Sequence, residues 1–250
     1  MNIEKMNVLR NDAFTFGVKL SDEQLIQFYR YYEMLIDWNE KINLTSITDF
    51  DEVLKKHFLD SLSIGRILNQ DSSLSILDIG TGAGFPGIPI KIAYPNTKIT
   101  LMDSLNKRIH FLNEVITELK LDGIETIHER AEDFAKEGLL REKYDICVSR
   151  AVANLSSLCE LCLPYVKVGG KFVSYKSEKA MEELITSKNA ISILGGGNVY
   201  CDTFTLPDTL IFEKSVSETS VSRTLVIIEK EKATPLKYPR KAGTPVKKPL

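Results

Sequence analysis

The stretch Leu74-Ser-Ile-Leu-Asp-Ile-Gly-Thr-Gly-Ala-Gly-Phe-Pro-Gly-Ile-Pro-Ile90 decides how this chain folds. Its first residues form a short apolar run, which is typical of a buried parallel strand. Three glycines follow at alternate positions, and glycine lets the backbone turn sharply and lets another molecule approach closely. The residues from Phe85 onward can open a helix, because proline is tolerated in a first turn. The strand, the glycine bend and the helix together predict a site for a nucleotide-type cofactor.

Two cofactors fit such a bend. The dinucleotide pattern G-x-G-x-x-G occurs at Gly82, Gly84 and Gly87. The pattern D-x-G-x-G-x-G, which starts at Asp78 and Gly80, resembles the first motif of class I S-adenosylmethionine (SAM) methyltransferases. A pyrophosphate needs amide groups aimed at negative charge, whereas SAM carries a positive amino group and a sulfonium, so a carboxylate beside the bend favours SAM. Asp103, after the next apolar run, can accept hydrogen bonds from ribose hydroxyls in either case.

The composition indicates a globular protein with one large domain and an appendage. The chain has 250 residues, 43% of them hydrophobic, and no apolar run long enough to span a bilayer, so we expect no membrane association. The first residues lack the basic start and apolar core of a signal peptide, and the cysteines read as reduced thiols, so we expect a cytoplasmic location. Cys159 and Cys162 form a C-x-x-C without further zinc ligands nearby. We interpret them as packing residues and expect no metal.

Strand and helix patterns alternate from Leu74 onward, which predicts an α/β domain around a parallel sheet. Expected strands cover residues 75–79, 98–102, 124–128, 144–149, 171–176, 198–205 and 223–230. Expected helices cover residues 85–94, 105–120, 132–142, 154–166 and 178–194. The long loop 206–221 has no helical pattern, so the last two strands should pair antiparallel. Seven mostly parallel strands with an antiparallel strand at one edge form the Rossmann-like sheet of class I SAM methyltransferases, whereas NAD domains normally have six parallel strands.

The residues before the first strand carry only helical patterns. A capping box at Ser21 and Gln24 begins a helix over 20–38, and a further helix is expected over about 51–68. We therefore expect an N-terminal helical cap over 1–70, a SAM-binding domain over 71–232 and a basic C-terminal arm over 233–250. His57 lies on the apolar side of its helix without a nucleophile or metal partner, so we interpret it as a structural histidine.

Two later segments agree with a methyltransferase. The run Leu163-Pro-Tyr-Val-Lys-Val-Gly-Gly-Lys-Phe-Val173 resembles the turn before the fifth strand of that family. Ala131-Glu132-Asp133 resembles its adenine-contacting segment, where a carboxylate can accept a hydrogen bond from the adenine amino group. Because these segments follow the glycine bend in the right order and spacing, they favour SAM over NAD.

Basic residues recur where four successive strands should end: Lys107, Arg108, Arg130, Arg150 and Lys176. Ligands of open α/β sheets bind at this edge, so these cations should surround the mouth of the pocket. The chain from Ala233 onward has five positive side chains and no negative ones: Lys237, Arg240, Lys241, Lys247 and Lys248. Prolines in this segment predict an extended arm suited to a phosphate backbone. The rim and the arm together predict a nucleic-acid substrate.

Residues that other nucleic-acid methylases require are absent after the fourth strand. Amino-group methylases place an Asn/Asp-Pro-Pro-aromatic segment there, and this chain has Ser149-Arg-Ala-Val-Ala-Asn154. C5-cytosine methylation needs a cysteine nucleophile, and Cys147 lies within the expected strand. The possibility that is left is methylation of an atom that has an available lone pair. Guanine N7 is such an atom, because it needs alignment with the methyl group and no general base, and unstacked bases in RNA loops are accessible to such a site.

The chain resembles the RsmG (GidB) family, bacterial enzymes that methylate guanine N7 in the 530 loop of 16S ribosomal RNA. The matching segments are residues 38–45, 57–62, 78–89, 103–112, 130–132, 149–151 and 238–245. The last of these, Arg-Lys-Ala-Gly-Thr-Pro after Pro239, is the most specific, since it has no general structural reason to recur. The resemblance implies SAM contacts at Gly80, Phe85, Ala131, Glu132 and Arg150, and no catalytic base.

The expected site combines these observations. Besides the residues that the resemblance implies, we expect SAM contacts from Asp78, Gly82, Gly84 and Asp103. Arg150 and Lys176 are the expected catalytic residues. The residues expected to contact RNA are Lys107, Arg108, Arg130, Arg240, Lys241, Lys247 and Lys248. We expect a monomer whose partner is 16S ribosomal RNA or the small ribosomal subunit, and not DNA.

Three other functions remain open on the sequence. A SAM methyltransferase acting on a small molecule or a protein would not need the basic arm. An NAD-dependent oxidoreductase would bind NADH at the glycine bend. A non-catalytic RNA-binding protein could keep the methyltransferase fold without transferring a methyl group.

Overall fold

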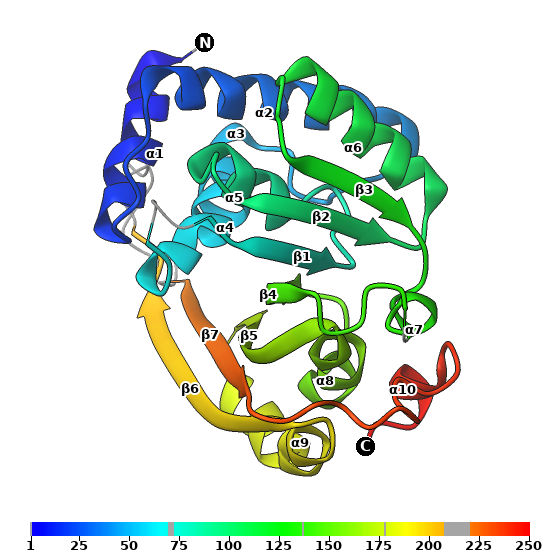
Figure 1. The fold of residues 1–250 in the computed structure, drawn as a ribbon. Helices are drawn as coiled ribbons and strands as arrows, with labels where there is room; N and C mark the ends of the chain where they lie inside the picture. The colour runs from blue at the N-terminus through cyan, green and yellow to red at the C-terminus, as the bar shows by residue number, and fades with distance from the viewer. Residues whose placement is uncertain (1, 70–72, 137, 178, 208–220) are drawn as a thin grey trace.

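A seven-stranded sheet crosses the middle of the molecule in this computed structural model, which describes residues 2–69, 73–136, 138–177, 179–207 and 221–250 (Figure 1). The strand order is β3-β2-β1-β4-β5-β7-β6. The strands are β1 (Ser75–Ile79), β2 (Lys98–Asp103), β3 (Ile124–His128), β4 (Tyr144–Arg150), β5 (Val166–Lys176), β6 (Gly196–Thr205) and β7 (Ser222–Lys230). Strands β1 to β5 pair in parallel, and β7 runs antiparallel to both β5 and β6. The predicted class I SAM-methyltransferase fold is confirmed.

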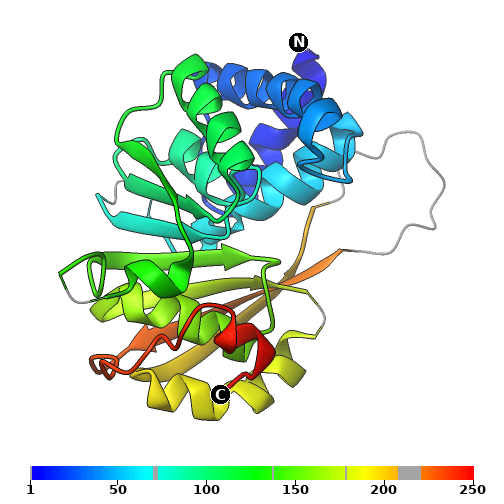
Figure 2. The same ribbon diagram turned by 90° about the vertical axis from the view of Figure 1, so that its right-hand side faces the viewer.

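Helices cover both faces of the sheet (Figure 2). The helices on one face are α1 (Ile3–Thr15), α2 (Asp22–Ile42), α5 (Gly87–Ala93) and α6 (Asn106–Glu118). The helices on the other face are α7 (Ala131–Phe134), α8 (Leu155–Cys162), α9 (Ala180–Ile193) and α10 (Thr244–Lys247). Each face has its own hydrophobic core, and every residue of α5 is buried, including Lys91, whose ammonium donates to the carbonyls of Pro95 and Thr97.

The N-terminal helices differ from the expected ones. The capping box at Ser21 is present, but α2 continues to Ile42, and α1 was not predicted. The helix expected over 51–68 is broken into four short pieces: α3 (Phe50–Val53), a π-helical turn η1 (Leu54–Leu59), α4 (Asp60–Leu62) and a 3₁₀ turn η2 (Ser63–Arg66). Turns of the π type often occur at functional sites, and this one faces the larger cavity described below.

Two elements in the sheet domain have different lengths from those expected. The helix predicted over 132–142 ends at Phe134, and the Arg141 side chain donates to the free carbonyl of Ala135 at 2.9 Å. Strand β5 begins at Val166, so the Gly169-Gly170 turn expected before the strand lies within it. The loop predicted over 206–221 lies mostly outside the described residues, as does the expected helix start at 178.

Aromatic side chains join the N-terminal helices to the glycine bend. The Tyr31 ring of α2 stacks on Phe58 at 5.4 Å between centroids and lies 5.4 Å from Phe85. Its hydroxyl donates to the carbonyl of Ala83 inside the bend. The predicted division of the chain into domains at residues 70 and 232 stays a prediction. The helices before and after residue 70 pack into the same hydrophobic core.

The C-terminal residues 233–250 are folded, so the prediction of an extended arm is wrong. The segment runs along α7 and α8 and ends beside them in α10 (Figure 2). The Arg141 side chain donates to the carbonyls of Thr234, Pro235 and Tyr238. The prolines do prevent a long helix or a strand, and the tertiary structure provides the hydrogen-bond partners that regular structure would have provided.

The described residues contain neither a membrane-spanning helix nor a disulfide bond. Within the described ranges, no helix combines the length and apolar character needed to cross a bilayer. All four cysteines are free thiols, and Cys159 and Cys162 are buried in α8.

The Tyr31 hydroxyl gives a first prediction. Tyr31→Phe leaves the buried carbonyl of Ala83 without this donor, so we expect the free energy of unfolding to fall by about 1 kcal/mol. Urea denaturation measures it. The same change at Tyr200, whose side chain is half-exposed on β6, should alter stability by less than about 0.5 kcal/mol. Equal effects at the two positions would contradict the structural role of Tyr31.

Candidate functional site

A buried carboxylate holds the glycine bend. Asp78 Oδ2 accepts from the Thr81 hydroxyl at 2.6 Å and from the Gly87 amide at 2.9 Å, so one carboxylate joins both sides of the bend. Burial raises the pKa of Asp78 to about 6, against the opposing effect of these two hydrogen bonds. The second oxygen, Oδ1, is buried without a hydrogen-bond partner among the described residues. Asp78 therefore supports the bend from below.

The glycine bend has little room for a side chain at Gly80 and Gly84, and its backbone angles favour glycine at all three positions. The φ angles of Gly80, Gly82 and Gly84 are 68°, 61° and 97°, a region that favours glycine. A Cβ on Gly80 would come within 2.5 Å of Val152, and one on Gly84 within 2.7 Å of the Tyr31 hydroxyl. Conformation and close neighbours therefore both favour glycine at Gly80 and Gly84, and conformation alone favours it at Gly82.

Asp103 lies at the end of β2, beside the bend. Its carboxylate is 4% exposed and accepts from the Gly82 amide at 2.9 Å. Arg108, which we expected to contact RNA, instead forms an ion pair with Asp103 at 3.1 Å. Lys107, also an expected RNA contact, donates to the carbonyl of Ile42 at 3.2 Å. Both cations thus have partners within the fold.

Two cavities open on either side of the bend. The larger has a volume of about 800 Å³ and is lined by the bend, the π-helical turn, and the ends of β4 and β5. The smaller, of about 430 Å³, is lined by the end of β2, the start of α7 and the C-terminal segment. Four residues line both cavities: Gly80, Arg108, Ala151 and Val152. The two cavities therefore meet above Gly80.

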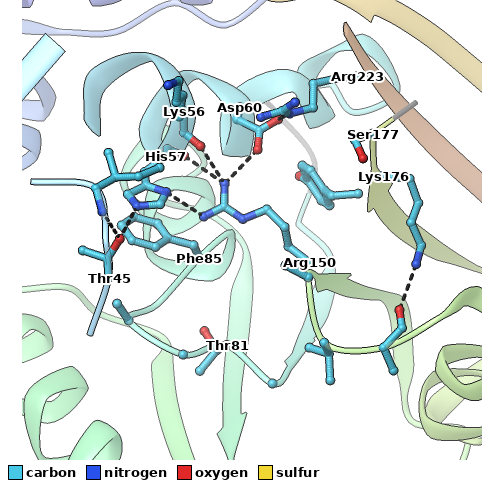
Figure 3. Close-up of a pocket in the computed structure, with 18 of the residues that line it drawn as sticks. Thr45, Lys56, His57, Asp60, Thr81, Phe85, Arg150, Lys176, Ser177 and Arg223 are labelled. Carbon is cyan, nitrogen blue, oxygen red and sulfur yellow. Dashed lines mark hydrogen bonds and ion pairs between the residues drawn. The ribbon is translucent and has the colours of Figure 1, made fainter. Parts of the chain in front are cut away.

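Arg150 reaches into the larger cavity from the end of β4 (Figure 3). Its Nη1 lies 2.9 Å from Asp60 Oδ2, and its guanidinium carbon lies 5.0 Å from the centre of the Phe85 ring. The next residue, Ala151, has a φ of 56°, which is strained for a residue with a side chain. Arg150 is thus fixed by an ion pair and an aromatic face, on a strained strand end.

Asp60 binds a second arginine. Its Oδ1 accepts from Arg223 Nε at 3.0 Å, while its Oδ2 takes Arg150. The Asp60 side chain is 5% exposed, so burying its charge requires these partners. One carboxylate therefore joins α4, the end of β4 and the start of β7.

His57 lines the same cavity and stacks on Phe85, with 4.5 Å between ring centres. Its Nε2 lies 2.8 Å from the Thr45 hydroxyl and its Nδ1 lies 3.4 Å from Arg150. Burial first, and Arg150 second, lower the pKa of His57 to about 3. The imidazole is therefore neutral at physiological pH.

Lys176, at the end of β5, is the second expected catalytic residue. Its ammonium donates to the carbonyl of Ala153 at 2.9 Å and to Glu183 at 2.7 Å. Its side chain is 9% exposed and lines the larger cavity with Arg150. Its expected catalytic role stays a prediction.

The start of α7 faces the smaller cavity, where Arg130, Ala131 and Glu132 all line the wall. Glu132 Oε1 accepts from the Gly243 amide of the C-terminal segment at 2.7 Å. Arg130 is exposed beside it. The structure thus brings the expected adenine-contacting residues to the cavity that adjoins Asp103.

The expected RNA contacts of the C-terminal segment fall into two groups. Arg240 forms an ion pair with the buried Glu160 at 2.6 Å, so its charge is engaged within the fold. The side chains of Lys241, Lys247 and Lys248 are open to solvent, Lys241 and Lys248 on the two sides of α10. These three remain candidates for RNA contact.

Thr45, Asp60 and Arg223 line the larger cavity but were not predicted as site residues, and His57 was interpreted as structural only. Asp60 carried a signal, because an acidic residue on the apolar side of a helix needs a buried partner. The sequence around Thr45 and Arg223 contains no comparable signal. Among the described residues, no three His, Cys, Asp or Glu side chains gather as metal ligands.

Comparison with known proteins identifies the family. The family model for rRNA small subunit methyltransferase G (GidB) matches residues 24–210. The Lachnoclostridium phytofermentans ribosomal RNA small subunit methyltransferase G is 52% identical over 94% of this chain and 93% of its own length. Its Staphylococcus saprophyticus counterpart is 50% identical over 97% of both chains. The chain belongs to the rRNA small subunit methyltransferase G family.

Solved structures outside this family share its fold. A SAM-dependent O-methyltransferase from Thermotoga maritima aligns with a TM-score of 0.52 at 15% identity, over 79% of this chain and 72% of its own. TYW2 from Pyrococcus horikoshii aligns with a TM-score of 0.52 at 16% identity, over 69% and 62%. At this level of identity, the likeness concerns the fold alone.

The residues around the bend fit SAM. A molecule with an adenosine end and a methionine end matches two cavities that meet above Gly80. Asp103 and Glu132 both line the smaller cavity, and their expected contacts to ribose hydroxyls and to the adenine amino group stay predictions. The carboxylates along the smaller cavity are hydrogen-bond acceptors, which suits the hydroxyl and amino groups of an adenosine.

The buried His57 gives a second prediction. Because its folded pKa is about 3 and its ordinary value is 6.5, the unfolded chain takes up a proton first as pH falls. His57 therefore reduces stability progressively as pH falls from about 6.5 toward 3. We expect its NMR ring resonances to stay constant between about pH 8 and pH 5, and His57→Gln to flatten the pH dependence of stability in this range. A titration of His57 near pH 6.5 would contradict this.

Proposed function

We propose that this protein transfers a methyl group from SAM to N7 of a guanine in the 530 loop of 16S ribosomal RNA. The observation that carries the proposal is the larger cavity, where paired cations meet the glycine bend and, among the described residues that line it, no side chain is free to act as a base. Both lining carboxylates, Asp60 and Glu183, are in ion pairs, and His57 is held neutral with a low pKa. Guanine N7 needs no base, because its lone pair is already available.

The protein's part in this reaction is alignment. SAM supplies a methyl group on a positive sulfonium. In the proposed complex, Arg150 donates to guanine O6, which lies next to N7 on the same edge of the base. Asp60 and Phe85 hold the guanidinium in place, so little freedom is lost when the base binds. Lys176 lines the same cavity as Arg150 and has its own partner, Glu183, and in the proposal it also contacts the nucleotide.

In the proposal, exposed basic side chains outside the cavity contact the RNA. Arg130, Lys241, Lys247 and Lys248 have side chains open to solvent near the smaller cavity, which supports them as phosphate contacts. The whole chain carries a net charge of −2, so attraction for RNA has to come from such local groups. A monomer acting in the cytoplasm on 16S ribosomal RNA or the small subunit is part of the same proposal.

Methyl transfer to ribosomal RNA gives the third prediction. Purified protein with radiolabelled SAM should label small-subunit RNA from cells that lack the gene, and the label should lie on guanine N7 of the 530 loop. Free rRNA, small subunits and whole ribosomes are compared as substrates. Label on a protein or small molecule would favour the first rival function. Binding of NADH without SAM would favour an oxidoreductase, and RNA binding without transfer would favour a non-catalytic protein.

Arg150 gives the fourth prediction. Arg150→Ala should lower kcat/KM for RNA by about 100-fold or more, because a positioned donor to the reacting base is lost. Circular dichroism and thermal unfolding should show that the variant remains folded. Arg30→Ala is the matched control, since Arg30 is half-exposed and pairs with Glu118 on the surface. Near-normal turnover by Arg150→Ala would contradict the assigned role.

A further inference from the structure

The C-terminal segment forms part of the smaller cavity. Gly243 and Val246 line its wall together with Ala131 and Glu132 of α7. The Gly243 amide donates to Glu132 Oε1 at 2.7 Å. Val246 is 54% exposed although it is apolar, as expected of a side chain at the open edge of a cavity. The last residues of the chain therefore contact the same space as the residues expected to bind adenine.

A buried ion pair fixes this segment. Glu160 lies in the last turn of α8 and is fully buried. It accepts from the Arg240 backbone amide at 2.7 Å and from Arg240 Nε and Nη2 at 2.9 and 2.6 Å. A carboxylate so deeply buried requires such complete pairing, and removing its partner would leave an uncompensated charge. Arg240 is thus the attachment point between the segment and α8.

Arg240 also sets the shape of the loop that follows it. Its Nη2 donates to the carbonyl of Lys248 at 2.8 Å, so one guanidinium joins both ends of residues 240–248. The hydroxyls of Ser157 and Ser156 donate to the carbonyls of Pro245 and Leu250, each at 2.8 Å. Gly243 and Val246 lie inside the loop, so their places at the cavity depend on these contacts.

We propose that residues 240–248 form the wall that closes the adenine end of the cofactor site, and that Arg240 is a positioning residue for cofactor binding. Arg240 acts through the loop: it places the Gly243 amide, which orients the Glu132 carboxylate and leaves Oε2 to accept from the adenine amino group. Val246 covers the purine ring from the open side. This inference rests on the proposal that SAM is the cofactor.

One consequence separates this role from RNA binding. If Arg240 served the RNA, its replacement would weaken RNA binding and leave cofactor affinity unchanged. If it positions the loop, cofactor affinity falls even without RNA. A bound cofactor should also stabilise the loop, because the ligand and the loop contact each other across the cavity.

Calorimetry with S-adenosylhomocysteine, in the absence of RNA, tests the positioning role. We expect Arg240→Ala to raise the Kd about tenfold or more, because the loop shifts and the hydrogen bond from the Gly243 amide to the Glu132 carboxylate is displaced. Arg240→Lys should restore part of the affinity. Arg66→Ala is the matched control: Arg66 forms a two-point ion pair with Asp202, at 2.6 and 2.9 Å, and lines neither cavity. Its Kd should stay within about twofold of the wild type.

Hydrogen exchange on the wild-type protein provides a readout that does not depend on a variant. Addition of S-adenosylhomocysteine should slow amide exchange in residues 240–248 as well as in the glycine bend. Protection of the bend without the loop would overturn the inference, as would a folded Arg240→Ala protein with unchanged affinity. If Arg240→Ala does not fold, the exchange result alone decides. A wild-type protein that does not bind S-adenosylhomocysteine at all would refute the cofactor proposal, and this inference with it.

Discussion

The whole site depends on one carboxylate buried in the end of a strand. Asp78 accepts a hydrogen bond from each side of the glycine bend, through Thr81 and Gly87. A buried carboxylate without such donors would be strongly unfavourable, so the acid and the bend require each other. The strand before the bend and the helix after it are both core elements, which fixes the bend at the edge of the sheet. Both cavities open from that fixed position.

Three more buried acids assemble the walls around this centre. Asp60 pairs with Arg150 and Arg223, and Glu160 pairs with Arg240. Asp103, at the end of β2, pairs with Arg108. Such pairs add little net stability compared with apolar packing, but breaking one is costly, so they hold particular segments in particular places. Through them, the N-terminal helices and the C-terminal segment both become parts of one site.

Charge is distributed unevenly between the whole molecule and its cavities. The chain has a small net negative charge, yet the larger cavity is lined by Lys56, Arg108, Arg150, Lys176 and Arg223. A polyanion would therefore be attracted only at short range, near the mouth of this cavity. Most of these cations are held by a carboxylate, so they form a fixed surface for a substrate. This arrangement agrees with membership of the rRNA small subunit methyltransferase G family.

The sequence by itself determined the sheet, the glycine bend and the expected cofactor-binding edge, because these depend on local patterns of apolar residues, glycines and a single acid. It did not reveal α1, whose apolar residues do not form a clear stripe. It also gave the C-terminal arm the wrong shape, because prolines rule out helix and strand but say nothing about tertiary contacts. Only the tertiary structure decided that Arg240 belongs to the fold and Asp60 to the site. Their partners lie 80 and 90 residues away along the chain, and pairings at that distance depend on how the folded elements meet.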